Sequence, residues 1–539
     1  MKSWVCKGVA KDGQPRSNQS PPGPHDEFEN FGTDCAICGL TQEQVEGGGG
    51  GAGLPIAKIA AAAAAVLVIG GIGTGVVALL GGNPPNIDPP IDVGEEGDDD
   101  PLPPIEPGSL RAGLYTWEPA RFSWGQQTLF PGNASVPRTE GIEAFNQGDY
   151  ATAINSFQRA VDGNRNDPEV LIFLNNARAR QQGSPLTLAA VVPVDNATNS
   201  AQEMLRGIAQ AQEEFNKSRG DGEPLLEIII ANDGNEPEVS KRVAEELVKD
   251  SSVLGVVGHN SSDASKAPLE IYQAAGLALI SPTSTSTELS SDVFFRTVPS
   301  DTISAESLAQ YAKEEMDISN VVIFYNPDSS FSRSLQSAFE KRFKDLGGTS
   351  SSQDMTDSEF DAGIAVATAA SDDGAEAIVL FPNTDYRSVA IEIAKANARL
   401  QNRKLPLLGG DSLYSIDILK TGGASVDGLI LAVSWFSGSG QFEAFSQASE
   451  KQWGGLVSWR TATSFDATQA FIKSLSSGAN RSTVLDNLKQ VSLPANETSG
   501  QAFEFTADGD RQSDPVLVKV SREQSAASGV EFGFELLLD

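Results

Sequence analysis

Two apolar runs of the sequence each end in a group of hydroxyl side chains. In a parallel sheet, strands end where helix N-termini present unpaired N–H groups, so hydroxyls at that point suit a carboxylate or another small oxyanion. Ser and Thr also cap helices, which would explain either loop alone, but two such loops on successive strands favour binding. The residues are Ser261 and Ser262 after VLGVVG, and Thr283, Ser284 and Thr285 after LALIS.

A third loop offers an acidic group. The run from Leu405 to Gly410 leads to Asp411, which either faces an ammonium group or caps a helix that starts near Leu413. Gly410 to Leu413 also spells the GDSL hydrolase motif, but that chemistry needs a downstream His and none follows His259. Ser261 and Ser262 follow shortly after His259 in the sequence, but proximity in the sequence does not make a Ser and a His a catalytic dyad. We therefore predict a binding protein and no enzyme.

The N-terminal residues contain a possible metal site. Cys35 and Cys38 have the spacing of a zinc knuckle, and Trp4 to Cys6 resembles the first strand of a zinc ribbon. A tetrahedral site needs four ligands, and His25 is the only substitute for the partner expected just after Cys6. Three alternatives stay open: one structural zinc held by Cys6, His25, Cys35 and Cys38, a ribbon with free thiols, or a redox pair. No cofactor is expected elsewhere.

Charge and length limit the function classes. The chain has 539 residues, and its 39 basic residues against 72 acidic ones give a net charge of −33, which argues against nucleic acid as a partner. The length corresponds to several domains, and the hydrophobic content of 40% is enough for large cores.

One segment is predicted to span a membrane. Residues 59–80 are uncharged and form the core of a transmembrane helix at 56–80, although a buried Ala/Gly helix is the alternative. Basic residues precede it and acidic ones follow, so the N-terminus is expected in the cytoplasm and the large C-terminal part in the periplasm or another extracytoplasmic space. Residues 1–53 then form a cytoplasmic ribbon-like module with a Gly linker, and residues 81–138 an acidic, Pro-rich spacer and irregular segment.

Residues 139–183 show helical spacing of apolar side chains. The segment resembles a single tetratricopeptide repeat. We expect a docking or spacer element rather than a peptide-binding groove, because one repeat cannot bury its apolar face without neighbours. The matching positions are Gly148, Tyr150, Ala153, Phe157, Ala160 and Pro168.

Residues 184–539 alternate short apolar runs with amphipathic helices, which is typical of an α/β fold with parallel sheets flanked by helices. The length indicates two lobes. We place the first at about 184–298 and 434–495, and the second at about 299–433 and 496–539.

Four stretches in this region resemble type I periplasmic ligand-binding proteins of the branched-chain amino-acid (leucine/isoleucine/valine) family, the receptors of ABC importers. They begin at Val191, Gly255, Phe294 and Leu407, and include GVVGHNSSDASKAPLEIYQAAGLALISPTSTSTEL and LLGGDSL. The resemblance implies that Ser261, Ser262, Thr283, Ser284 and Thr285 bind the α-carboxylate of an amino acid and that Asp411 binds its ammonium. It also implies that Phe331, where many relatives have Tyr, covers the ligand, and that Asn383 and, less surely, Trp459 complete the pocket.

The expected function is capture of an amino acid or a related small polar ligand by lobe closure, for an ABC permease. The alternatives are a tethered sensor or scaffold that signals to the cytoplasmic module, and a binder of amide-like, urea-like or anionic ligands.

Overall fold

A computed structural model describes residues 4–6, 28–30, 114–130, 132, 135–400, 404–522 and 530–537. The chain divides into two compact units, residues 1–99 and 100–539. In the first, strands β1 (Trp4–Cys6) and β2 (Phe28–Asn30) pair antiparallel. Three of the expected zinc ligands, His25, Cys35 and Cys38, and the apolar segment 59–80 lie outside the described residues. Within the described ranges, no helix combines the length and apolarity that crossing a membrane requires.

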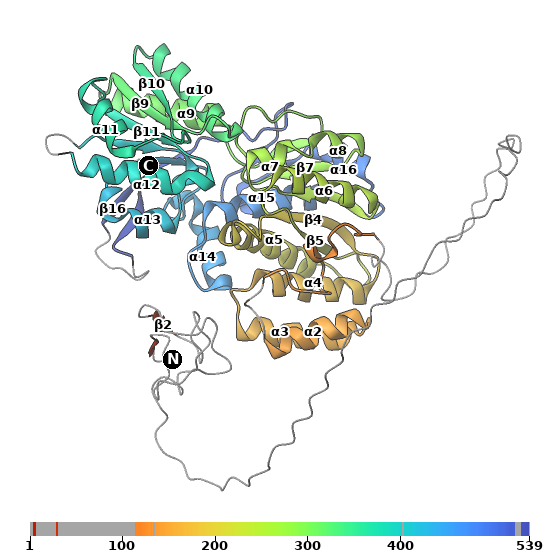
Figure 1. The fold of residues 1–539 in the computed structure, drawn as a ribbon. Helices are drawn as coiled ribbons and strands as arrows, with labels where there is room; N and C mark the ends of the chain where they lie inside the picture. Colours follow the sequence, from red (N-terminus) through yellow and green to blue (C-terminus); the bar gives the residue numbers. More distant parts are fainter. Residues whose placement is uncertain are drawn as a thin grey trace, which may run out of the picture. The chain divides into compact units, whose positions relative to one another are not determined.

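The second unit contains two lobes, each built on its own sheet (Figure 1). The first sheet has the order β3-β5-β4-β6-β7-β8 and is parallel except for β3. Its central strands are apolar runs buried on both faces, as a sheet covered by helices requires. The strands are β3 (Phe122–Ser123), β4 (Leu186–Val192), β5 (Leu226–Asn232), β6 (Val253–Val257), β7 (Ala278–Ser281) and β8 (Phe294–Arg296).

Helices cover both faces of the first sheet. Leu188 and Ala190 of β4 belong to the cluster with α5 and α15, whereas Ala189 and Val191 belong to the cluster with α6 and α8. The helices of this lobe are α5 (Thr198–Ser218), α6 (Pro237–Lys249), α7 (Ser262–Lys266), α8 (Leu269–Ala274), α14 (Glu443–Trp453), α15 (Trp459–Ser474) and α16 (Arg481–Leu488), with the short strands β14 (Ser492–Leu493) and β15 (Phe503–Glu504).

The second lobe repeats this plan with a mixed sheet of order β10-β9-β11-β12-β13-β16-β17. In this sheet β16 runs antiparallel to both of its neighbours, β13 and β17. Its strands are β9 (Asn320–Tyr325), β10 (Thr349–Asp354), β11 (Ala377–Phe381), β12 (Leu407–Gly409), β13 (Ile430–Val433), β16 (Val516–Arg522) and β17 (Phe532–Leu536). Its helices are α9 (Asp301–Gln310), continued by a π-helical turn at Tyr311–Glu315, α10 (Ser330–Asp345), α11 (Ala362–Ser371), α12 (Arg387–Ala398) and α13 (Ile416–Gly422).

The chain crosses between the lobes after β8, after β13 and before β16. We placed the last crossing near residue 495, but the structure places it later. Phe503 and Phe505 pack in the core of the first lobe, and Arg511 forms a buried ion pair of 2.6 Å with Asp466 there. The return to the second sheet therefore begins only at Val516, which pairs with Val433.

Residues 114–130, expected in the spacer, are part of the first lobe. Phe122 and Ser123 pair with Ala231 and Ile230 and extend the sheet beyond β5. The Tyr115 hydroxyl donates to Asp250 Oδ2 at 3.0 Å, which anchors the segment to the end of α6. The boundary differs because a two-residue edge strand has no sequence signal of its own.

The three helices that follow pack against the same lobe. These are α2 (Val136–Asn146), α3 (Tyr150–Gly163) and α4 (Pro168–Gln182); α4 lies between α3 and α5 (Figure 1). The Asn176 side chain bonds both the carbonyl and the N–H of Ile228 on β5, at 2.7 and 2.9 Å. Helix α4 is therefore an integral layer of the first lobe and not a separate module.

Candidate functional site

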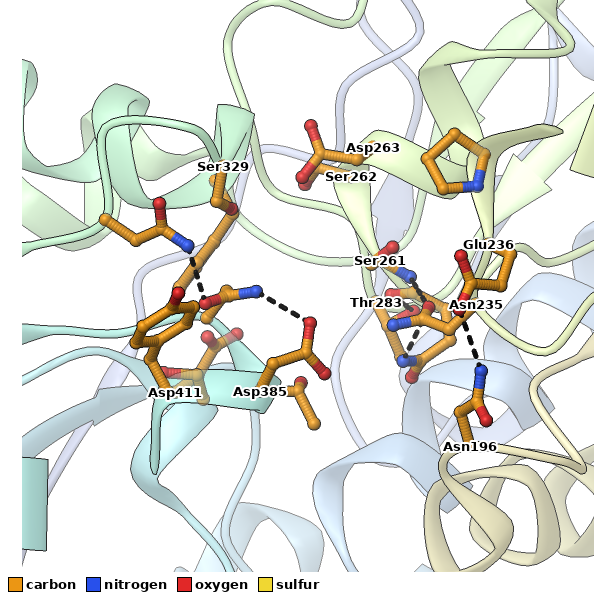
Figure 2. Close-up of a pocket in the computed structure, with 18 of the residues that line it drawn as sticks. Asn196, Asn235, Glu236, Ser261, Ser262, Asp263, Thr283, Ser329, Asp385 and Asp411 are labelled. Carbon is orange, nitrogen blue, oxygen red and sulfur yellow. Dashed lines mark hydrogen bonds between the residues drawn. The ribbon is translucent and has the colours of Figure 1, made fainter. Parts of the chain in front are cut away.

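A cleft of about 340 Å³ opens between the two lobes, where the loops after several strands converge (Figure 2). Its volume is in the range of small-molecule pockets. Of the residues predicted to bind ligand, those that line the cleft are Ser261, Ser262, Thr283, Phe331, Asn383, Asp411 and Trp459. Ser284 and Thr285 do not line it.

The hydroxyls of Ser261 and Ser262, both in the lining of the cleft, accept hydrogen bonds from backbone N–H groups. Ser261 Oγ accepts a hydrogen bond from the Ala264 N–H at 3.2 Å, and Ser262 Oγ accepts one from the Ser286 N–H at 3.3 Å. A hydroxyl that accepts from an N–H keeps its own proton for another acceptor. Both groups can therefore donate to a carboxylate that enters the cleft.

The second hydroxyl loop has a different role. Thr283 Oγ1 donates to the carbonyls of Asn260 and His259, at 2.7 and 3.2 Å, so its single proton is already used. Ser284 Oγ pairs with Ser265 Oγ at 2.7 Å in the interior. Thr285 is also buried, and its carbonyl accepts from the Asp301 N–H at 2.8 Å. Thr283 therefore fixes the shape of the first loop, and the three residues do not place three further donors in the cleft.

His259 supports this loop from behind. Its Nδ1 lies 2.7 Å from Asp233 Oδ2 and its Nε2 lies 3.1 Å from the Tyr272 hydroxyl, with all three side chains buried. Burial raises the pKa of Tyr272 well above its usual value, so the phenol keeps its proton. His259 thus bonds neither Ser261 nor Ser262, and its role is to position the loop.

Asp411 lies on the opposite wall, directly after β12. Burial raises its pKa to about 6, although the guanidinium groups of Arg460 and Arg387 act in the opposite direction. The group is therefore mostly ionised at neutral pH and able to pair with a cation. The close packing behind it needs Gly410, since a Cβ there would lie 2.6 Å from Leu335 Cδ2.

Phe331 and Asn383 complete this wall. Phe331 lies in the first turn of α10 and lines the cleft. Asn383 Oδ1 accepts from Asn326 Nδ2 at 3.0 Å, and Asn383 Nδ2 donates to Asp385 Oδ2 at 3.1 Å. Asn383 therefore orients two further residues of the cleft.

Arg460 is a cleft residue that the sequence did not reveal. It is only 6% exposed, lies over the Trp459 ring at 4.4 Å, and its Nη1 contacts Glu203 Oε2 at 3.4 Å. It reaches the cleft because α15 packs closely on α5: a Cβ on Gly207 would lie 2.1 Å from the Thr461 carbonyl oxygen. Such a helix–helix contact has no local signature. The other lining residues that we did not predict include Asn196, Asn235, Glu236, Asp263, Asp328, Ser329, Asp385 and Tyr386.

Asp301 lies at the crossing between the lobes and is 1% exposed. Burial raises its pKa to about 7, opposed by the nearby polar groups of Thr285 and Ser334, and the charge of Asp411 raises it further. Two carboxyl groups near the cleft therefore change charge close to neutral pH.

Solved structures share the two-lobed fold. A leucine binding protein from Thermotoga maritima matches with a TM-score of 0.57 at 17% identity, covering 65% of this chain and 97% of that one. A branched-chain amino acid substrate binding protein from Streptococcus pneumoniae, solved with isoleucine, matches with a TM-score of 0.55 at 19% identity, covering 65% of this chain and 100% of that one. The predicted α/β two-lobed fold is confirmed.

Curated relatives match more locally. A leucine-, isoleucine-, valine-, threonine- and alanine-binding protein from Pseudomonas aeruginosa is 25% identical over 166 residues, which is 30% of this chain and 44% of the relative. An amino acid binding protein from the same organism is 27% identical over 149 residues, 27% of this chain and 40% of the relative. The chain thus spans less than half the length of the curated relatives it matches.

The match to a family model is much longer than these local alignments. The model described as periplasmic binding protein matches residues 186–525, which include both sheets apart from the edge strands β3 and β17. Because this match extends over more than half of the chain, the protein belongs to the periplasmic binding protein family.

Proposed function

We propose that the protein is an extracytoplasmic solute-binding protein that captures an amino acid or a related small polar ligand by closure of its lobes and delivers it to an ABC importer. Family membership confirms the non-enzymatic prediction, because the family binds solutes and does not transform them. The names of the curated relatives support an amino acid as the ligand.

The cleft supports this proposal because hydrogen-bond donors lie on one of its walls and a carboxylate lies on the other. Ser261 and Ser262 on one wall have hydroxyl protons free for a carboxylate, and Asp411 on the other wall is a carboxylate with a pKa of about 6. A zwitterion would join the two walls, because its carboxylate and its ammonium would each contact a different lobe. Lobe closure removes water from both contacts and strengthens them.

The experiment is a search for the bound ligand in the full-length protein. We expect mass spectrometry of small molecules released from the purified protein to find a zwitterionic metabolite, and calorimetric titration with it to give one site per chain. A protein that retains none and binds none of the twenty amino acids would refute the proposal. A fragment that begins at residue 184 is unsuitable, because it lacks β3 and α4 of the first lobe.

We also propose that residues 56–80 anchor the protein in the membrane, with residues 1–53 in the cytoplasm. The uncharged stretch and the charge asymmetry on its two sides support this. Added protease should then degrade the region after residue 110 in spheroplasts and leave residues 1–53 intact. Protection of the large domain would contradict both the topology and delivery to an importer. The tethered sensor remains the second proposal, and a partner of residues 1–53 that changes with ligand would favour it.

The zinc site of Cys6, His25, Cys35 and Cys38 also remains a proposal, as does the tetratricopeptide-like character of residues 139–183. Metal analysis of the full chain, purified with its thiols reduced, should find about one zinc per molecule if all four residues are ligands.

A further inference from the structure

Five carboxylates line the cleft, against one guanidinium, that of Arg460. Besides Asp411 they are Glu236 and Asp263 on the first lobe, and Asp328 and Asp385 on the second (Figure 2 labels all but Asp328). In the part of the chain that the structure describes, none of these four forms an ion pair with a basic side chain. Glu236, Asp328 and Asp385 are exposed at the rim of the cleft, where they give it a negative potential that solvent and salt screen in part.

Neutral donors hold three of the four in place. Asp385 Oδ2 accepts from Asn383 Nδ2 at 3.1 Å, and Glu236 Oε1 accepts from Asn196 Nδ2 at 3.1 Å. Asp263 Oδ1 accepts from the Ser330 N–H across the lobes at 3.0 Å. These bonds orient the carboxylates without neutralising them.

The guanidinium groups near Asp411 do not balance this charge. Arg460 contacts Glu203 at 3.4 Å, and Arg387 interacts with Glu203 and Asp417 besides Asp411. A metal ion is a poor match as well, because no group of three or more His, Cys, Asp or Glu side chains in the described ranges is placed to hold one.

The apolar surface of the cleft is aromatic and not aliphatic. Among the described residues that line the cleft, none is Leu, Ile, Val, Met or Ala. The larger apolar surfaces are aromatic, from Phe331, Tyr386 and Trp459, and Trp459 already holds a guanidinium over its ring at 4.4 Å. Aromatic faces with carboxylates around them suit an organic cation with a methylene stem.

We propose that the ligand carries a second positive group, so that the cleft selects a basic amino acid, or an amino-acid-like molecule with a distal ammonium or guanidinium, over a branched-chain one. This inference rests on the proposed function, since it assumes that the α-carboxylate and α-ammonium occupy the sites described above. The distal cation then lies among Glu236, Asp328 and Asp385, which form no ion pair with a basic side chain of the described residues.

The test is calorimetric titration of the full-length protein with two nearly isosteric pairs, L-arginine with L-citrulline and L-lysine with L-norleucine. We expect the charged member of at least one pair to bind about tenfold more tightly or better at low salt, and the gap to narrow in 0.5 M salt. The double variant Asp328→Asn/Asp385→Asn should reduce the ratio of charged to neutral affinity. The matched control Glu270→Gln/Glu306→Gln removes two exposed acids outside the cleft and should keep it.

Citrulline and norleucine binding as tightly as their charged partners would overturn the inference and leave the proposed function intact. A double variant whose ratio of charged to neutral affinity equals that of the control would also overturn the inference. Failure of all four probes and of the remaining amino acids to bind would refute the proposed function, and this inference with it.

Discussion

The hydroxyl and amide groups by which the first lobe faces the cleft are fixed by hydrogen bonds inside that lobe, whereas the second lobe presents Asp411, a carboxyl group whose pKa is shifted by burial. Thr283 and His259 hold the first-lobe loop through its own backbone and through buried partners. Asp411 on the second lobe has a pKa of about 6, and Asp301 at the crossing has a pKa of about 7. One wall is preorganised and the other responds to pH and to ligand charge.

This difference indicates how the two walls divide the work of binding. Fixed donors recognise a carboxylate at little cost in reorganisation. A carboxyl group that is unfavourable to ionise before ligand binds gains most when an ammonium arrives, because the new charge pair offsets its desolvation. Under the proposed function, the second lobe therefore gains more binding free energy from lobe closure than the first.

The largest expected effect is the loss of Asp411. Removing one partner of a buried charge pair costs about 2–5 kcal/mol, so Asp411→Ala should weaken binding of an amino acid roughly thirty- to several-thousand-fold. Calorimetric titration with the ligand identified by mass spectrometry measures this directly. A variant that binds as well as the parent would mean that no ammonium lies there, and an amide-like, urea-like or anionic ligand would fit better.

Next in size is the contrast between two serines of the first lobe. Ser262→Ala removes a donor in the cleft and should cost about 1–3 kcal/mol of binding free energy, whereas Ser284→Ala should change affinity little, because its hydroxyl bonds Ser265 in the interior. The same titration compares them, and denaturant unfolding of both variants checks that the loop is intact. Equal losses of affinity would show that both hydroxyl loops act on the ligand.

A smaller effect is expected from pH. Asp411 must be ionised to hold an ammonium, so affinity should fall as pH drops through about 6, by about tenfold between pH 8 and pH 5. Asp411→Asn should abolish this step, and any step that is left reports Asp301, whose pKa should be somewhat lower than in the parent because the charge of Asp411 no longer raises it. Affinity of the parent that stays constant from pH 8 to pH 5 would contradict the assignment.

The smallest expected effect is on stability. The folded-state pKa of Asp411 lies above its unfolded value near 3.9, so its contribution to stability is present at low pH and is lost as pH rises through about 6. At pH 8, denaturant unfolding should therefore give Asp411→Asn a free energy of unfolding about 1–2 kcal/mol higher than that of the parent. This gain should shrink toward pH 4. A gain that is the same at both pH values would have another cause.

The sequence predicted the layers well because they follow from long apolar runs. Runs such as LTLAAVV and AIVLF are the strands β4 and β11. It missed β10, because Thr349–Asp354 is a Ser-rich edge strand without an apolar face. It missed β3 because two residues carry no periodicity. The two faces of the cleft were predictable from strand ends, whereas Arg460 and the acidic rim depend on how helices and loops from distant segments meet.

The segment that contains the edge strand β3 also determines which lobe is connected to the preceding residues of the chain. Residues 114–130 and α4 contribute to the two hydrophobic clusters of the first lobe and to neither cluster of the second. Leu114 therefore connects to the first lobe and not to the second. If residues 56–80 anchor the protein and the lobes close as proposed, the lobe with the hydroxyl groups is the one tied to the anchor, and the lobe with Asp411 is the one that moves.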